Sequence, residues 1–124
     1  PHMMVASDGV YNSPSPHPRG YGLFARILRR FVRELGLFPL ETAIYKMSGF
    51  PAHRFGLTDR GQIAPGMAAD LVVFDLDQIA DQATWHSPLR PAVGVEWVLV
   101  NGQPVIADSK PSGQFPGRVL KRTA

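Results

Sequence analysis

The stretch Met3-Met4-Val5-Ala6-Ser7-Asp8-Gly9 decides how this sequence of 124 residues is interpreted. A short apolar run bounded by turn residues predicts a buried strand over residues 3–7. A carboxylate that follows a buried parallel strand lies at the sheet edge where α/β folds place their chemistry. Spacing alone favours a plainer alternative, a turn in which the Asp8 side chain accepts hydrogen bonds from nearby amides.

The segment after the predicted strand is a Pro/Gly-rich loop over residues 9–21. It carries His17 and Arg19, so these side chains and Asp8 lie within one predicted strand end and its loop. An arginine in such a loop is usually solvated, and a histidine before a proline usually shapes the loop. Tyr21 either lines a pocket or packs under the loop, and the residues alone leave both open.

Hydrophobic periodicity predicts three helices after this loop. Apolar residues recur at i, i+4 and i+8 over residues 22–35, which is the pattern of an amphipathic helix. Gly36 suits the position just past its end. A second helix is predicted over residues 39–47, with a proline in its first turn, and a short third helix over residues 51–55.

The polar face of the first predicted helix is rich in arginine. Two interpretations stay open, a solvated outer helix face, which is the commoner case, and a stripe that binds phosphate groups. The second would make the chain a basic nucleic-acid-binding module, with binding that depends on salt. The arginines concerned are at positions 26, 29, 30 and 33.

The second half of the chain predicts a small antiparallel sheet. Strands are predicted over residues 70–75, 95–100 and 103–107. Asn101-Gly102 is a strong signal for a type I′ hairpin turn between the last two strands. Pro104 predicts an edge or a bulge in the returning strand, because proline cannot donate to the ladder.

Composition narrows the class of protein. The chain contains no cysteine, which excludes a disulfide framework and a thiolate zinc site within it. A formal net charge of +3 is mildly basic, and no aromatic residues interleave with the basic ones, so neither nucleic acid nor a membrane is an expected partner. No apolar run approaches the ~20 residues of a membrane span. We expect a cytoplasmic protein.

The order of predicted elements is unusual for a free-standing domain. A buried strand at residues 3–7 needs neighbours on both sides, and no other parallel strand is predicted before residue 70. We therefore expect the chain to be a piece of something larger.

Two sets of motifs carry a resemblance to a known family. The run RGQIAPGMAADLVVFD at residues 60–75, followed by VNG at residues 100–102, resembles the C-terminal end of metal-dependent amidohydrolases. A second set of motifs makes nearly all 124 residues resemble the N-acyl-D-amino-acid deacylases, also called D-aminoacylases. This set comprises ASDG at 6–9, HPRGYG at 17–22, KMSGFPA at 46–52 and PGRVL at 116–120.

This resemblance implies an α/β fold that is the C-terminal fragment of a (β/α)8 amidohydrolase barrel, with its last strand and helices, plus part of a small β-sandwich. Residues 1–56 would form the last β/α unit of the barrel with the following helices. Residues 57–124 would form the β-sandwich portion and the C-terminal tail.

The resemblance also implies an activity, the hydrolysis of the amide bond of N-acyl-D-amino acids. Asp8 would take a proton from the metal-bound water and later deliver it to the leaving amine, and it is a candidate weak metal ligand. Arg19 would bind the α-carboxylate of the substrate, and His17 and Tyr21 would line the substrate site.

The zinc ligands of this family come from earlier strands: a His-x-His motif, a bridging cysteine and two later histidines. The histidines present here, His2, His17, His53 and His86, do not reproduce that pattern. We therefore expect this chain alone to bind no metal and to be incomplete, unless the missing N-terminal part is supplied as another chain. The alternatives are a non-catalytic fragment or remnant that self-associates, and an amidohydrolase of the hydantoinase or dihydroorotase kind.

Overall fold

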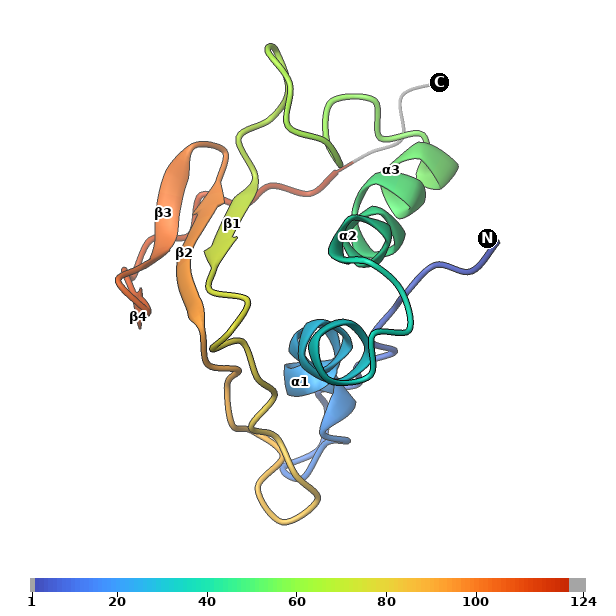
Figure 1. The fold of residues 1–124 in the computed structure, drawn as a ribbon. Coiled ribbons are helices and arrows are strands. Elements are labelled where there is room, and N and C mark those ends of the chain that lie inside the picture. Colours follow the sequence, from blue (N-terminus) through green and yellow to red (C-terminus); the bar gives the residue numbers. More distant parts are fainter. Residues whose placement is uncertain (1, 121–124) are drawn as a thin grey trace.

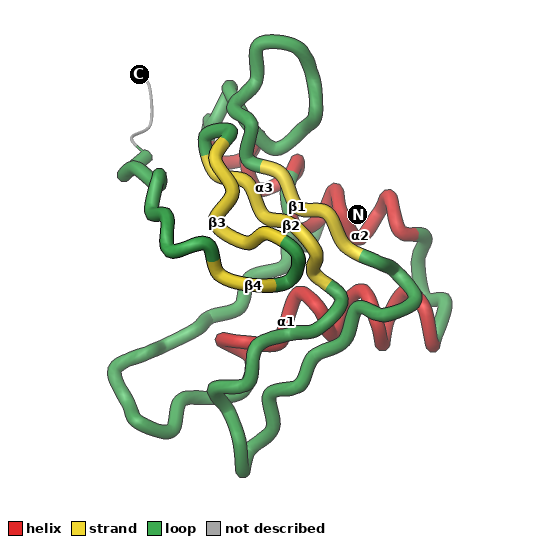
Figure 2. Tube along the Cα trace, turned by 90° about the vertical axis from the view of Figure 1, so that its left-hand side faces the viewer, coloured by secondary structure: helices red, strands yellow, loops and turns green. Residues whose placement is uncertain are grey.

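A computed structural model describes residues 2–120 of the chain. Figure 1 shows two layers, a group of helices and an antiparallel sheet, with the N-terminal segment running beside the helices. Figure 2 shows long loops, among them residues 56–70, which connect the helices to the sheet, and residues 75–94, which join two neighbouring strands of the sheet. The α/β class expected from the sequence is confirmed, whereas the described residues form no barrel.

The first helical stretch begins at Arg19, within the segment predicted as a loop. Helix α1 (Arg19–Arg26) continues without a break into a π-helix (Ile27–Glu34). The prediction that the loop extends to residue 21 is therefore wrong by three residues. Pro18, at the N-cap, already has helical angles (φ −53°, ψ −25°). The predicted end is confirmed, because Gly36 has a φ of +57°, in the left-handed region that favours glycine.

Two shorter helices follow, close to where the sequence predicts them. Helix α2 (Leu40–Met47) begins directly after a proline. Helix α3 (Gly49–Phe55) begins two residues before the predicted start and ends at Gly56, whose φ is +72°. One residue separates the two helices, Ser48, whose backbone angles are not helical (φ −132°, ψ −76°).

The sheet has four antiparallel strands in the order β1-β2-β3-β4. The strands are β1 (Leu71–Phe74), β2 (Val95–Val100), β3 (Gln103–Ala107) and β4 (Lys110–Pro111). The type I′ turn is confirmed, because Asn101 and Gly102 both have positive φ, 49° and 77°. The predicted bulge is confirmed as well, since the β2–β3 register shifts at Leu99, the partner of Pro104. Strand β4 has no counterpart in the sequence prediction.

The predicted strand over residues 3–7 is wrong. These residues have no regular secondary structure. They contact α2 instead, where the Val5 N–H donates to the Lys46 carbonyl (3.1 Å) and Lys46 Nζ donates to the Met3 carbonyl (2.9 Å). A strand needs a neighbouring strand to pair its backbone groups, and a helix side offers none.

The core is small for a chain of this length. Four buried residues form its centre, three from the helices and one, Ile79, from the loop after β1: Ala25, Leu28, Ala43 and Ile79. The chain exposes 8822 Å², about a third more than the roughly 6,600 Å² expected for a closed monomer of its mass. Large apolar side chains, such as Met3, Val72 and Phe115, contribute to this excess.

The arginine-rich face of the first helical stretch is only partly solvated. Arg29 Nε donates to Asp81 Oδ1 (2.8 Å), and Arg33 Nη1 donates to the carbonyls of Leu76 (2.6 Å) and Ile79 (3.1 Å). The interpretation of this face as a solvated outer surface is therefore wrong for Arg29 and Arg33. These two side chains hold the helical layer against the loop after β1. No helix in the described part of the chain is long and apolar enough to span a membrane.

Candidate active site

The structure brings Asp8 and Arg19 together. Arg19 is the first residue of α1, and its Nη2 lies 2.6 Å from Asp8 Oδ2. Arg19 Nε also donates to the backbone carbonyl of Asp8 (3.1 Å). The guanidinium therefore holds both the side chain and the backbone of Asp8, which has a φ of +48°.

This ion pair is accessible to solvent. The Asp8 side chain is 78% exposed and that of Arg19 is 39% exposed. An exposed pair of this kind adds only about 0.2–1 kcal/mol of stability, because water screens the charges. Either group can therefore leave its partner for a ligand at little cost, and a carboxylate and a planar guanidinium are both open to a molecule from solution.

His17 supports Arg19 from the preceding turn. Its Nδ1 accepts a hydrogen bond from the Arg19 backbone N–H (3.0 Å), which occupies that nitrogen. The imidazole also makes an edge-to-face contact with Trp85, with ring centroids 4.4 Å apart. The structure thus gives His17 the loop-shaping contacts that its position before proline indicates, and its role in binding substrate stays a prediction.

Tyr21 lies beside a second tyrosine, Tyr11, which the sequence analysis did not single out. The Tyr21 and Tyr11 rings meet edge to face at 5.8 Å, and the Tyr11 hydroxyl donates to the Gly20 carbonyl (3.0 Å). A Cβ on Gly9 would lie 2.6 Å from that hydroxyl, and one on Gly20 would lie 2.9 Å from the ring. The two glycines flanking the loop were the available signal, because they leave room for an aromatic ring.

The described residues do not make a metal site by themselves. Within residues 2–120, no three His, Asp or Glu side chains come close enough together to hold a metal ion. Asp8 stands as a lone carboxylate paired with Arg19. His2, His53 and His86 are exposed. This donor set does not fit a zinc ion, so a complete site would need ligands from outside these residues.

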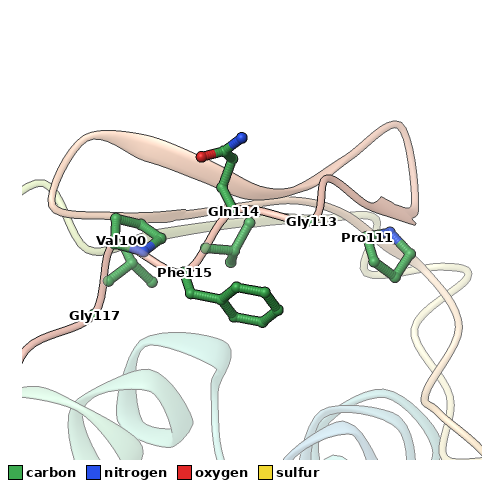
Figure 3. A pocket seen from close by; sticks show the side chains of 8 residues that line it. Val100, Pro111, Gly113, Gln114, Phe115 and Gly117 are labelled. Carbon is green, nitrogen blue, oxygen red and sulfur yellow. The ribbon is translucent and has the colours of Figure 1, made fainter.

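An apolar hollow of about 390 Å³ lies elsewhere, between the sheet and the C-terminal tail. Figure 3 shows Phe115 of the tail pointing into the space on one side of the sheet. Its lining residues come from β2, β3, β4 and residues 113–117, with no charged side chain among them. The hollow offers no catalytic groups and is not the candidate active site.

Comparison with known proteins identifies the family. The model of the amidohydrolase family matches residues 2–106. This chain belongs to the amidohydrolase family. It is 52% identical over 121 residues to a D-aminoacylase of Alcaligenes xylosoxydans xylosoxydans, a match that covers 98% of this chain and 25% of that enzyme. The resemblance to D-aminoacylases inferred from the motifs is confirmed.

Solved structures agree with the sequence match. A D-aminoacylase structure, described for the functional role of its binuclear metal centre, superposes with a TM-score of 0.92 at 51% identity, covering 96% of this chain and 25% of the other. An N-acyl-D-glutamate deacylase from Bordetella bronchiseptica, complexed with zinc and a phosphonate inhibitor, gives a TM-score of 0.81 at 49% identity, covering 87% and 24%. This amidohydrolase chain therefore spans about a quarter of the length of its relatives.

Proposed function

We propose that this chain supplies the proton-transferring and carboxylate-binding groups of an N-acyl-D-amino-acid deacylase. The observation that carries the proposal is the Asp8–Arg19 pair, in a chain that matches a D-aminoacylase over almost its whole length. In the reaction, water adds to the acyl carbon and the amide C–N bond breaks. The products are a carboxylate and the free D-amino acid.

Asp8 and Arg19 would perform different parts of this reaction. Asp8 accepts a proton from the attacking water and returns one to the nitrogen that leaves, which is general acid–base catalysis by a positioned carboxylate. Arg19 binds the α-carboxylate of the substrate through two parallel N–H donors, which fixes orientation as well as charge. Its present contact with a carboxylate oxygen at 2.6 Å supports this role. Tyr21 and His17 would line the same side of the substrate.

The metal of such an enzyme would be held by other residues. Since residues 2–120 do not complete a metal site, the ligands would come from the three quarters of the relatives that this chain does not match. Asp8 is the one group at this site that could reach the metal as a weak ligand. Zinc, when bound there, would polarise the scissile carbonyl.

The remainder of an amidohydrolase is therefore the partner we propose for this chain. The excess exposed area and the unpaired outer edge of β1 support a missing neighbour, as does the absence of a strand partner for residues 3–8. Residues 1–56 would complete a barrel, and residues 57–124 would complete a β-sandwich. The partner segment would be linked to this chain or be a separate polypeptide.

A complementation assay tests the proposal. The chain is mixed with zinc and the unmatched three quarters of the Alcaligenes D-aminoacylase, and release of the free amino acid from N-acetyl-D-methionine and its L enantiomer is measured. We expect D-selective turnover only when both polypeptides are present. Asp8→Asn should lower turnover by about 10²- to 10⁴-fold.

Asp108→Asn is the matched control, because Asp108 is an exposed aspartate with a φ of +49°, like the +48° of Asp8, in the turn between β3 and β4. It should leave turnover unchanged. A stable complex with bound zinc that hydrolyses nothing, or an Asp8→Asn complex that works normally, would contradict the proposal.

A further inference from the structure

A tight turn in the loop between β1 and β2 carries an exposed aromatic residue toward the candidate active site. Trp85 is 71% exposed. The turn around it is closed by reciprocal backbone hydrogen bonds between Thr84 and Ser87, both 3.2 Å, and by the Ser87 N–H donating to Thr84 Oγ1 (3.1 Å). These bonds fix the backbone on both sides of Trp85, so the position from which its indole extends is fixed as well.

The segment leading to this turn is fastened along the first helical stretch. Asp81 accepts hydrogen bonds from Arg29 (2.8 Å) and Arg26 (3.3 Å). A Cβ on Gly22 would lie only 3.0 Å from the Asp81 Cβ and 3.6 Å from that of Ala83. This close approach holds residues 81–83 against α1, a few residues before Trp85.

The Trp85 ring contacts one residue of the site, His17. The two rings meet edge to face, with centroids 4.4 Å apart and an interplanar angle of 63°. An imidazole rotates about its side-chain bonds unless something restrains it. The indole restrains it in the orientation in which Nδ1 faces the start of α1, where it accepts the Arg19 N–H.

That hydrogen bond supports the start of α1. The helix has Pro18 as its N-cap residue, which makes no side-chain capping bond. The N–H groups of a first helical turn have no partner within the helix, and His17 supplies one for Arg19. The start of the helix in turn fixes the direction in which the Arg19 guanidinium leaves the backbone, toward Asp8.

We infer that Trp85 is a positioning residue for the substrate-binding arginine, acting through His17 on the first turn of α1. The series of contacts runs from Trp85 to His17, from His17 to the Arg19 N–H, and from the Arg19 side chain to Asp8. The inference rests on the proposed function for its catalytic meaning, but the contacts themselves can be tested without activity.

The structural test uses amide NMR of this chain. Trp85→Ala should shift the Arg19 amide resonance and make its hydrogen exchange about tenfold faster, because the bond to His17 opens more often. Trp85→Phe should restore both, since a benzene ring keeps the edge contact. Trp97→Ala, which removes the tryptophan of β2, should leave the Arg19 amide unchanged.

Two results would overturn the inference. One is an Arg19 amide unaffected by Trp85→Ala while the His17 signals change. The other is an equal effect of Trp97→Ala, which would mean general loosening. If Trp85→Ala fails to give a dispersed spectrum, Trp85→Phe and His17→Gln test the inference instead. Trp85→Phe must leave the Arg19 amide resonance in place, and His17→Gln must shift it.

The kinetic test uses the complemented enzyme. Trp85→Ala should raise the KM for an N-acyl-D-amino acid about tenfold with little change in kcat, because carboxylate binding is weakened in ground and transition states alike. Adding Trp85→Ala to Arg19→Met should raise KM little further, since Trp85 acts through Arg19. A fall in kcat at constant KM would overturn the inference. If the complex is inactive, the proposed function fails while the NMR test still decides the contacts.

Discussion

Two Arg–Asp pairs in this molecule share the same chemistry but lie in different surroundings. Arg19 and Asp8 are 2.6 Å apart, and Arg29 and Asp81 are 2.8 Å apart. The Asp8 side chain is 78% exposed, whereas that of Asp81 is 9% exposed. The exposed pair can exchange its partners for a ligand, while the half-buried pair is held in a network with Arg26 and Glu34. Burial, rather than distance, separates a candidate binding site from a structural contact.

The Arg29–Asp81 pair fastens the helical layer to the loop after β1. Burial alone would raise the pKa of the Asp81 carboxyl, but the hydrogen bond and charge of Arg29, with the charge of Arg26, outweigh it and lower that pKa. The hydrogen bonds from Arg29 to Asp81 and Glu34 raise the pKa of the Arg29 guanidinium. Both groups are therefore charged through the neutral pH range, and removing either takes a charge out of a network that also contains Arg26 and Glu34.

The largest effect on stability should come from Asp81→Asn. This change removes the charge that Arg26 and Arg29 share, and we expect the free energy of unfolding to fall by about 2 kcal/mol, less than for a fully buried pair because Arg29 is partly solvated. Urea unfolding followed by circular dichroism measures it. Asp108→Asn, in an exposed turn, is the control. An equal fall in its free energy of unfolding would show that the Asp81 contacts add no stability beyond that of an exposed aspartate.

Arg33→Met should have the next largest effect. Its guanidinium donates to two backbone carbonyls of the same loop, those of Leu76 and Ile79. Hydrogen bonds to charged groups contribute about 1.5–3 kcal/mol, and methionine keeps part of the packing, so a loss of about 1–2 kcal/mol is expected. Arg30→Met serves as the comparison, because Arg30 is more exposed and pairs with Glu34. Equal losses would argue that the carbonyl contacts contribute nothing.

Acid should weaken the contacts that Arg26 and Arg29 make with Asp81. Because the pKa of Asp81 is lowered on folding from its usual 3.8, the unfolded chain binds more protons than the folded one near that pH. The stabilisation is present above pH 3.8 and is lost as pH falls through the lower folded value. Glu34 and Asp59, whose pKa values hydrogen bonds from arginines also lower, act in the same direction. Unfolding free energy measured against pH should fall less steeply in Asp81→Asn, and an unchanged slope would refute this.

The smallest effect should come from Asp8→Asn. An exposed ion pair contributes little, so the free energy of unfolding of this chain should change by about 0.5 kcal/mol or less. The same urea unfolding experiment measures it. A loss as large as that of Asp81→Asn would show that the Asp8–Arg19 pair is a structural contact.

Local signals in the sequence were enough for most of the fold. The Asn101-Gly102 turn and the ends at Gly36 and Gly56 depend on backbone conformations that few residues adopt, so they are predictable from the chain itself. The strand expected at residues 3–7 failed because a strand depends on pairing partners, and an apolar run specifies none. The division at residue 56 and the barrel stay predictions.

Long-range contacts explain what sequence reasoning missed. The helical pattern placed Arg29 on a solvated face, because its partner, Asp81, lies 52 residues further along the chain. Trp85 lies in an irregular segment with no periodicity that would link it to His17. At the site, the proximity of Asp8, His17 and Arg19 was predictable because they are neighbours in sequence. Their catalytic roles rest on the resemblance and stay a prediction.

The most direct test of this account measures Asp8→Asn and Asp81→Asn side by side, with urea unfolding of the chain and D-amino-acid release by the complemented enzyme as the two readouts. We predict opposite effects of the two variants on stability and on turnover. Asp8→Asn should keep the stability of the chain and lose turnover, and Asp81→Asn should lose stability while the folded complex keeps turnover. These separate roles would be contradicted if Asp8→Asn unfolded the chain more than Asp81→Asn, or if turnover survived the loss of Asp8.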